Sequence, residues 1–214
     1  MTDIYSDCHR VLQERYDARP LADRTAAAIV HSEFTPDIAF ISARDFFFLS
    51  TVDPNGSPTV SYKGGAPGFV RVEGNTLVFP SYDGNGMFLS MGNITENPHV
   101  GLLFMDFVRP RRLRVQGTAT LDEGPAREAF PGAQFLVRVA PRQIFVDCPR
   151  YVHKYQRVET SKYVPAADGS APLALWKRLE IVHDTLTPKE QAEVEAAGFI
   201  SFDEYQAKVD AGEG

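Results

Sequence analysis

The sequence has few of the residues that build covalent or metal-held scaffolds. Its two cysteines, Cys8 and Cys148, lie far apart and form no Cys-x-x-Cys pair, and its histidines show no metal-ligand spacing. A disulfide framework or a zinc site is therefore not expected. We predict no metal ligands, a buried structural thiol at Cys148, and the reducing cytoplasm as the compartment.

The chain also lacks long apolar runs and an excess of positive charge. No segment is long and apolar enough to span a bilayer, and the N-terminal residues contain no secretory apolar region. The formal net charge is -6 over 214 residues, which disfavours binding to nucleic acids and to anionic membranes. We therefore expect neither as a partner.

Several catalytic motifs are missing as well. The sequence contains no P-loop, no Gly-x-Ser-x-Gly elbow and no dinucleotide fingerprint, and no pair of carboxylates stands out for acid–base chemistry. The catalytic residues are consequently unknown from the sequence alone.

Residues 1–45 predict an N-terminal helical extension. They contain two segments with helical spacing, separated by Pro20, and Thr35-Pro36 is typical of a helix start with Thr35 as N-cap.

Residues 165–214 predict a second helical extension, at the C-terminal end. Leu173, Trp176 and Leu179 share one face of a helix, and capping boxes begin at Thr187 and Ser201. We expect this extension to pack on the central domain, so that the chain forms one domain overall.

The middle of the chain, residues 46–164, predicts antiparallel strands. "FFFLSTVDPNGSPTVSYKG" and "GFVRVEGNTLVFPS" each read strand, turn, strand. "HVGLLFMDF", "RRLRVQGTATL" and "FLVRVAPRQIFVD" follow through short connections, which favour a barrel or a sandwich. Both faces of "HVGLLFMDF" are apolar, which predicts that both are covered, one of them by a second subunit.

A glycine-rich loop, "SYDGNG", separates the second hairpin from a short helix that we expect to begin near Met87. The N–H groups at a helix start can bind an anion. The loop is therefore either a phosphate site or only a tight corner.

These segments occur in a fixed order that resembles the pyridoxamine 5′-phosphate oxidase-like family of flavin-binding split barrels, over roughly Phe46 to Tyr151. The resemblance rests on the Pro54-Asn55-Gly56 turn, "SYKGGAPGFVRV", "LVFPSYDGNG", "MGNITENPHVGLLFMDF" and "RRLRVQGTATL". In addition, "CPRYVHK" is similar to a subgroup of uncharacterised flavin-nucleotide-binding relatives.

The resemblance implies a mainly β protein with flanking helices, built on an antiparallel six-stranded split β-barrel. It also implies a homodimer that binds FMN in clefts between its subunits and acts on a small-molecule substrate. Relatives often carry Arg or Lys after the loop Asn or Ser, whereas Asn85 is followed by Gly86 and Met87. We therefore expect Lys63 and Arg71 to supply the positive charge for the phosphate.

The predicted cofactor-binding set comes from the second hairpin, the loop after it and one later strand. It consists of Ser61, Lys63, Gly64, Phe69, Val70, Arg71, Val72, Ser81, Tyr82, Asn85, Gly86, Met87, Arg112 and Gln116. Two members have an equally simple structural interpretation: Gly64, with Gly65, fits a β-bulge, and Arg71 fits a solvated strand position.

A cluster of arginines surrounds "RRLRVQG". Such a run is typical of nucleic-acid binding, but the acidic chain and the lack of interleaved aromatic residues disfavour it. The resemblance implies instead that Arg112 contacts the flavin edge or phosphate, where it would stabilise the anionic reduced flavin, or that the cluster forms salt bridges across a dimer.

Three functions remain open. The first is an FMN-dependent oxidoreductase that transfers a hydride or electrons between FMN and a small molecule, with unremarkable side chains because the chemistry belongs to the cofactor. The second is a non-catalytic flavin-binding carrier or sensor, and the third is a related barrel that uses a deazaflavin or haem.

Overall fold

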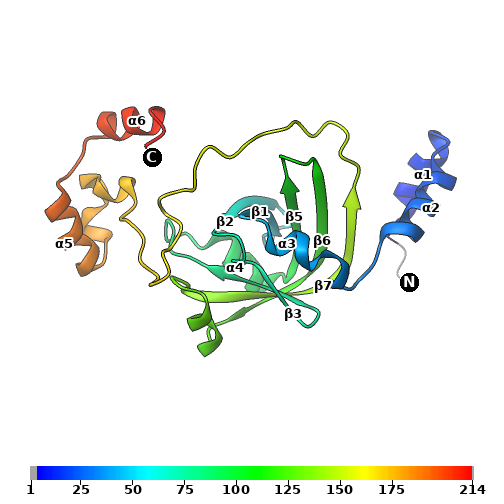
Figure 1. The fold of residues 1–214 in the computed structure, drawn as a ribbon, viewed down its shortest axis with the longest axis horizontal. Coiled ribbons are helices and arrows are strands. Elements are labelled where there is room, and N and C mark those ends of the chain that lie inside the picture. Colours follow the sequence, from blue (N-terminus) through cyan, green and yellow to red (C-terminus); the bar gives the residue numbers. More distant parts are fainter. Residues whose placement is uncertain (1–3, 214) are drawn as a thin grey trace. The chain divides into compact units, whose positions relative to one another are not determined.

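The structure is a computed structural model that describes residues 4–213. The chain forms two compact units, Met1–Val158 and Glu159–Gly214, and each is described by itself. Figure 1 labels the helices and strands. The expectation that the C-terminal extension packs on the central domain stays a prediction.

Short helices precede the sheet: α1 (Asp7–Arg15), α2 (Arg19–Ile29), the 3-10 helix η1 (Thr35–Asp37) and α3 (Ile38–Ser42). Pro20 lies in the first turn of α2 rather than between two helices, because a first-turn residue needs no intrahelical N–H bond. Thr35 is the first residue of η1, and the N-cap is Phe34 rather than Thr35. Phe40 and Ile41 of α3 are buried in the core of the first unit.

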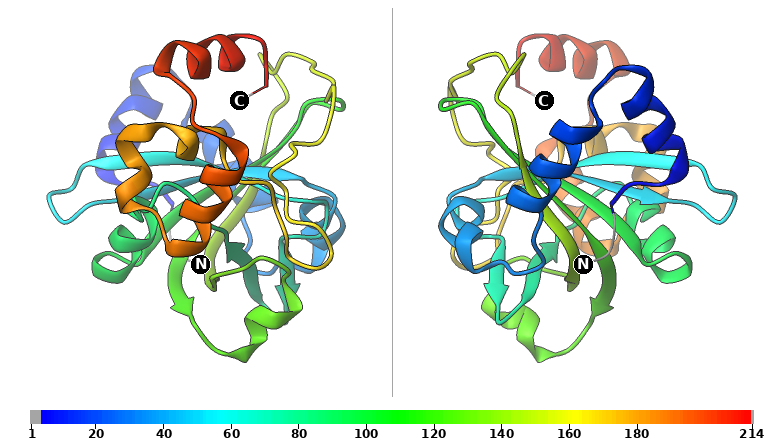
Figure 2. Two further views of the ribbon diagram at one scale, coloured as in Figure 1. Left: turned by 90° about the vertical axis from the view of Figure 1, so that its left-hand side faces the viewer. Right: turned by 90° about the vertical axis from the view of Figure 1, so that its right-hand side faces the viewer.

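The described residues form one seven-stranded antiparallel sheet, in the order β2-β1-β5-β6-β7-β4-β3. Its strands are β1 (Phe46–Val52), β2 (Pro58–Gly64), β3 (Arg71–Glu73), β4 (Thr76–Ser81), β5 (His99–Asp106), β6 (Arg111–Asp122) and β7 (Phe135–Asp147). The antiparallel, mainly β prediction is confirmed. The strand count is seven, which agrees with the seven segments read from the sequence and corrects the six-stranded barrel that the resemblance implies; β3 is a short edge strand of three residues. Figure 2 shows the curved sheet from two sides.

The core lies inside the curve of this sheet. Alternate residues of β1 point inward, so that Phe47 and Leu49 are fully buried. The ring of Phe47 contacts those of Phe79 and Phe104 at centroid distances of 4.9 and 5.1 Å. Burying each such side chain stabilises the fold by roughly 1.5–3 kcal/mol, which makes this aromatic cluster a main source of barrel stability.

A bulge between β6 and β7 helps the sheet to curve. The pairing register shifts between Gln116 and Gly117. A Cβ atom at Gly117 would lie 2.1 Å from the carbonyl oxygen of Ala140, so the close approach of the two backbones requires glycine. Bulges of this kind bend the strand and increase its twist.

The second unit consists of the 3-10 helices η3 (Leu175–Arg178) and η4 (Glu180–Thr185) followed by α5 (Pro188–Ala197) and α6 (Phe202–Asp210). The capping boxes predicted at Thr187 and Ser201 are both confirmed. The amphipathic helix predicted around Trp176 is wrong: η3 has only four residues, and both predicted leucine partners lie outside it. None of the helices that the structure describes is long and apolar enough to cross a membrane.

Candidate functional site

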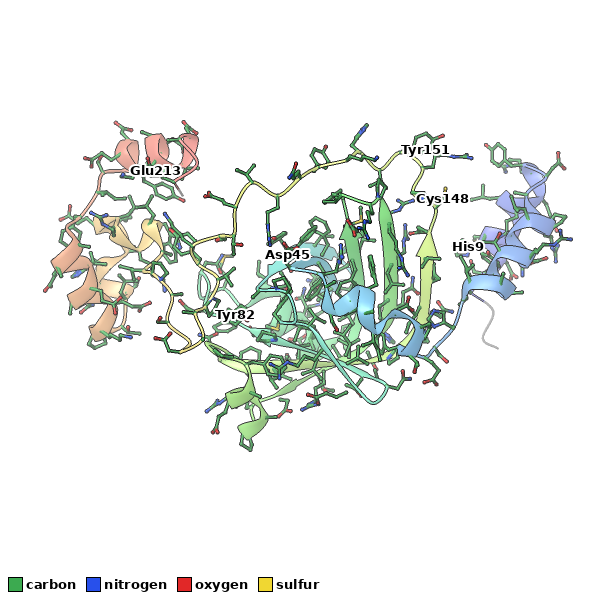
Figure 3. The ribbon with its side chains drawn as sticks, in the orientation of Figure 1. His9, Asp45, Tyr82, Cys148, Tyr151 and Glu213 are labelled. Atoms are coloured by element: carbon green, nitrogen blue, oxygen red, sulfur yellow. The ribbon has the colours of Figure 1, made fainter. Side chains whose placement is uncertain are left out.

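A pocket of about 230 Å³ lies where β2 and β4 end and α4 (Leu89–Glu96) begins. It is lined by Ser61, Lys63, Ser81, Tyr82, Gly84, Asn85, Gly86, Met87, Phe88, Leu89, Ser90 and Met91. Figure 3 labels Tyr82 on the barrel. The pocket thus brings together the end of the first hairpin, the end of the second, and the loop between the second hairpin and α4.

Strand geometry places the polar groups of β2 in this pocket. Ser61 and Lys63 are two residues apart and therefore point to the same face of the strand. The hydroxyl of Ser61 is hydrogen-bonded to that of Ser90 in α4, with an oxygen–oxygen distance of 3.0 Å. This contact holds the first turn of α4 against the end of β2.

The glycine-rich loop ends in an uncapped helix start. The side-chain oxygen of Asn85 accepts a hydrogen bond from the Met87 N–H at 3.1 Å, and Gly86 has a φ of 73°, which favours glycine. Phe88, the N-cap of α4, has no side-chain cap bond, so among the described residues the first-turn N–H groups lack a side-chain acceptor. Such N–H groups carry partial positive charge toward the pocket.

Lys63 is the one charged side chain among the residues that line the pocket. Burial lowers the pKa of its ammonium group, because desolvation disfavours the charged form. No carboxylate lines the pocket to offset that cost. The pocket therefore combines a partly buried cation, an uncapped helix start and several hydroxyls, which is the donor set of an anion site.

Tyr82 adds a second titratable group to the lining. Burial raises the pKa of its phenol, and the nearby positive charge of Arg71 partly opposes that shift. The phenol is consequently neutral at physiological pH and is able to donate a hydrogen bond to a ligand.

The structure brings half of the fourteen predicted cofactor-binding residues to this one pocket. These are Ser61, Lys63, Ser81, Tyr82, Asn85, Gly86 and Met87. The predicted helix start near Met87 is corrected to Leu89. Phe88 adopts a left-handed conformation, which cannot be part of a right-handed helix, so the helix begins after it.

The predicted residues between β2 and β4 lie outside the pocket lining. Phe69 and Val70 are buried in the barrel core, and Val72 packs against that core. The ring of Tyr62 occupies the space beside Gly64, where an added Cβ atom would lie 2.7 Å from it. Gly64 therefore makes room for a side chain of the protein itself.

Arg71 is also outside the lining, although it was expected to bind phosphate. Its guanidinium donates a hydrogen bond to the carbonyl oxygen of Ala129 at 2.8 Å and lies 3.9 Å from the ring centroid of Phe130. Both partners belong to the connection between β6 and β7, which includes the 3-10 helix η2 (Pro125–Ala129). Arg71 thus fastens this connection to the sheet.

Arg112 and Gln116 of β6 have partners away from the pocket as well. Arg112 donates a hydrogen bond to the carbonyl oxygen of Cys148 at 2.6 Å, and Gln116 accepts one from Arg142 at 3.4 Å. Cys148 itself is exposed, which corrects the prediction of a buried thiol. It lies in the irregular segment after β7, where Figure 3 labels it together with Tyr151.

The sequence-based set missed several lining residues, of which Ser90 is the most informative. Ser90 is almost fully buried and supplies a hydroxyl in the first turn of α4. A correct helix start would have identified it, because the first turn of a helix that follows an anion-binding loop faces the anion.

Metal binding finds no support in the described part of the chain. No group of three or more His, Cys, Asp or Glu side chains there could hold a metal ion.

Comparison with protein families gives one match: the model described as pyridoxamine 5′-phosphate oxidase covers residues 38–155. This range contains the whole sheet and the pocket. A search of curated proteins gives no match.

Three solved structures illustrate what the chain is similar to. HupZ of Group A Streptococcus is 19% identical, with 57% of this chain and 98% of that chain covered and a TM-score of 0.43. An F420 reductase is 21% identical, with 49% and 93% covered and a TM-score of 0.39. HutZ, a haem storage protein from Vibrio cholerae, is 21% identical, with 53% and 94% covered and a TM-score of 0.40.

The family match spans more than half of the chain and includes every strand of the sheet. The order of strands and the position of the glycine-rich loop before α4 agree with the resemblance found in the sequence. The chain therefore belongs to the pyridoxamine 5′-phosphate oxidase-like family of split-barrel proteins.

Proposed function

We propose that the protein binds FMN in the pocket at the start of α4 and acts as an FMN-dependent oxidoreductase on a small molecule. The observation that carries this proposal is the donor set of the pocket: Lys63, hydroxyl groups and an uncapped helix start, with no carboxylate in the lining. An FMN phosphate carries nearly two negative charges and needs such donors.

The pocket residues divide into charge and hydrogen-bond partners for the phosphate. Lys63 supplies the cation, and the N–H groups of Leu89 and Ser90 supply backbone donors. Ser81 and Tyr82 add hydroxyls from the end of β4. Placing FMN here makes the loop a phosphate site rather than only a corner.

The size of the pocket bears on how much of the cofactor it holds. Its volume of about 230 Å³ is below the roughly 300–1,000 Å³ of pockets that enclose a drug-sized ligand. The phosphate end fits, while the ring system extends beyond the lining. This supports a site that a second subunit completes.

When bound, FMN supplies the hydride and electron chemistry. The lining contains no histidine, cysteine or carboxylate, so we assign binding and orientation to the chain, and no side chain a catalytic role. Tyr82 is positioned to donate a hydrogen bond as a neutral phenol, since burial raises its pKa.

An apolar face on the outside of the sheet supports a homodimer. The rings of Tyr62 and Phe107 flank that of Phe46, with centroid distances of 5.3 and 5.9 Å. Val60 and Tyr62, on the edge strand β2, are 69% and 62% exposed. A second copy that covers this face would bury aromatic side chains of the kind enriched at interfaces.

One experiment separates the alternatives. The protein is purified without added cofactor, its absorbance spectrum is recorded, and NADH or NADPH is then added without air. We expect a flavin spectrum that bleaches with reductant and returns in air. A flavin spectrum that does not bleach would indicate a carrier or sensor, and a deazaflavin or haem spectrum would overturn the FMN assignment.

A further inference from the structure

The N-cap of α4, the residue just before the helix, combines backbone strain with exposure. Phe88 has φ 46° and ψ 28°, in the left-handed region that residues other than glycine rarely occupy. Its side chain is nevertheless 49% exposed. Packing inside the barrel therefore does not account for a large aromatic residue at a position that favours glycine or asparagine.

Phe88 belongs to an apolar rim at the mouth of the pocket. Met87 and Leu89, its neighbours in the lining, are 61% and 58% exposed. The ring of Phe88 is nearly parallel to that of Phe135, the first residue of β7, with an interplanar angle of 28° and a centroid distance of 6.3 Å. Three successive apolar side chains thus face solvent beside a binding pocket.

The polarity of the pocket changes from its floor to this rim. Its less exposed lining residues carry the hydroxyls of Ser61 and Ser90 and the ammonium group of Lys63, beside the buried side chain of Met91. A ligand with matching polarity has an anionic end and a flat apolar body. Strained residues that persist at a site commonly serve as ligand clamps.

We propose that Phe88 binds the planar ring of the ligand whose phosphate lies at Lys63. Phe88 and Phe135 form a shelf on which that ring stacks, so the site selects an aromatic body in addition to an anionic group. The inference rests on the proposed flavin binding and adds to it a residue that contacts the ring rather than the phosphate.

Phe88 variants separate the ring from the backbone conformation. Phe88→Leu keeps apolar area but removes the ring, Phe88→Trp keeps a ring, and Phe88→Gly relieves the left-handed strain. FMN, riboflavin and lumiflavin, the last having a methyl group in place of the ribityl chain and no phosphate, are titrated against each variant and the wild type. The matched control is Lys63→Met, which alters the phosphate end alone.

We expect Phe88→Leu and Phe88→Gly to weaken the binding of all three ligands by a similar factor, about tenfold, because the stacked ring is common to the three ligands. Phe88→Gly should have a melting temperature no lower than the wild type, so its loss of binding would not reflect unfolding. Phe88→Trp should retain binding and lower the fluorescence yield of the bound flavin, since a stacked indole quenches flavin emission. Lys63→Met should weaken the binding of FMN more than that of the two ligands that have no phosphate.

Other results would overturn the inference. If Phe88→Leu binds all three ligands like the wild type, or Phe88→Trp leaves the fluorescence of bound flavin unchanged, the ring does not stack on Phe88. If Phe88→Leu changes only the oligomeric state in light scattering, a second copy covers the rim instead. A wild-type protein that binds no flavin would refute the proposed function itself, which is a different result from flavin binding that is insensitive to Phe88.

Discussion

Replacing Lys63 by methionine removes the one charge in the pocket lining while keeping a side chain of similar length. A hydrogen bond to a charged group is worth roughly 1.5–3 kcal/mol. The dissociation constant of FMN should therefore rise by about one to two decades. Riboflavin has no phosphate, so its affinity should change by less than about threefold, which is under roughly 0.7 kcal/mol.

The structure also supplies a matched control. Arg71 is a cation on the same sheet, but its guanidinium is engaged by Ala129 and Phe130 outside the pocket lining. Arg71→Gln should leave the ratio of FMN to riboflavin affinity close to that of the wild type. Burial lowers the pKa of Lys63, which means that its charge is costly in the apoprotein. Lys63→Met should accordingly leave the unliganded protein at least as stable as the wild type.

The assay is a titration of FMN and of riboflavin, followed by flavin fluorescence, with thermal unfolding of each variant recorded in parallel. If Lys63→Met loses both ligands equally, or neither, Lys63 does not contact the phosphate. If Arg71→Gln shows the selective loss instead, the phosphate lies at Arg71 and the pocket is misassigned.

Four further results are expected. The ratio of FMN to riboflavin affinity should fall as pH rises through the folded-state pKa of Lys63, beginning below the usual lysine value of 10.5 because burial lowers that pKa; a ratio that does not change with pH would contradict this. The hydrogen bond from Lys177 holds the pKa of Glu190 at about 2. The two side chains are only 8% and 22% exposed. The contribution of this pair to the free energy of unfolding should therefore be fully present above pH 4.5 and be lost as pH falls toward 2. Lys177→Met should raise the Glu190 pKa in an NMR titration and destabilise the second unit by about 2 kcal/mol. Burial raises the pKa of Asp37 against the opposing charges of His31 and Arg111, so the stability that this carboxyl contributes should fall as pH rises from the usual carboxylate range through that raised pKa; the melting temperature of the wild type relative to Asp37→Asn should fall over the same range. Light scattering should give twice the monomer mass, and a monomer that retains FMN would refute the two-subunit site.

The parts of the fold that the sequence predicted well carry local signals. β7 follows the apolar run at Phe135–Asp147, and the helix starts at Thr187 and Ser201 follow from capping boxes that need only neighbouring residues. The turn at Asp53 is likewise local, since its carboxylate accepts hydrogen bonds from the N–H groups of Asn55 and Ser57.

The wrong predictions have two causes: partners that are distant in the sequence, and local backbone conformations that the residue types do not indicate. The connection after β6 provides the partners of Arg71, and nothing near Arg71 in the sequence indicates them. The start of α4 moved to Leu89 because Phe88 adopts a conformation that its residue type disfavours. The amphipathic helix predicted around Trp176 is wrong because the chain forms a four-residue 3-10 helix there, which is too short to place Leu173, Trp176 and Leu179 on one face.

The candidate site was predictable in outline because strand alternation and the glycine-rich loop point to one corner of the barrel. Ser61, Lys63 and the loop from Ser81 to Met87 meet there. Ser90 was missed because its position depended on where the helix begins.

In the proposed function, the FMN phosphate lies at the start of α4 beside Lys63. The most direct test is the amide spectrum of the ¹⁵N-labelled protein, recorded with FMN and with riboflavin at saturation. We predict that the amides of Leu89 and Ser90 shift most with FMN, and clearly less with riboflavin, because the phosphate accepts hydrogen bonds from these two N–H groups. Equal shifts with both ligands, or shifts concentrated elsewhere in the barrel, would contradict the assignment.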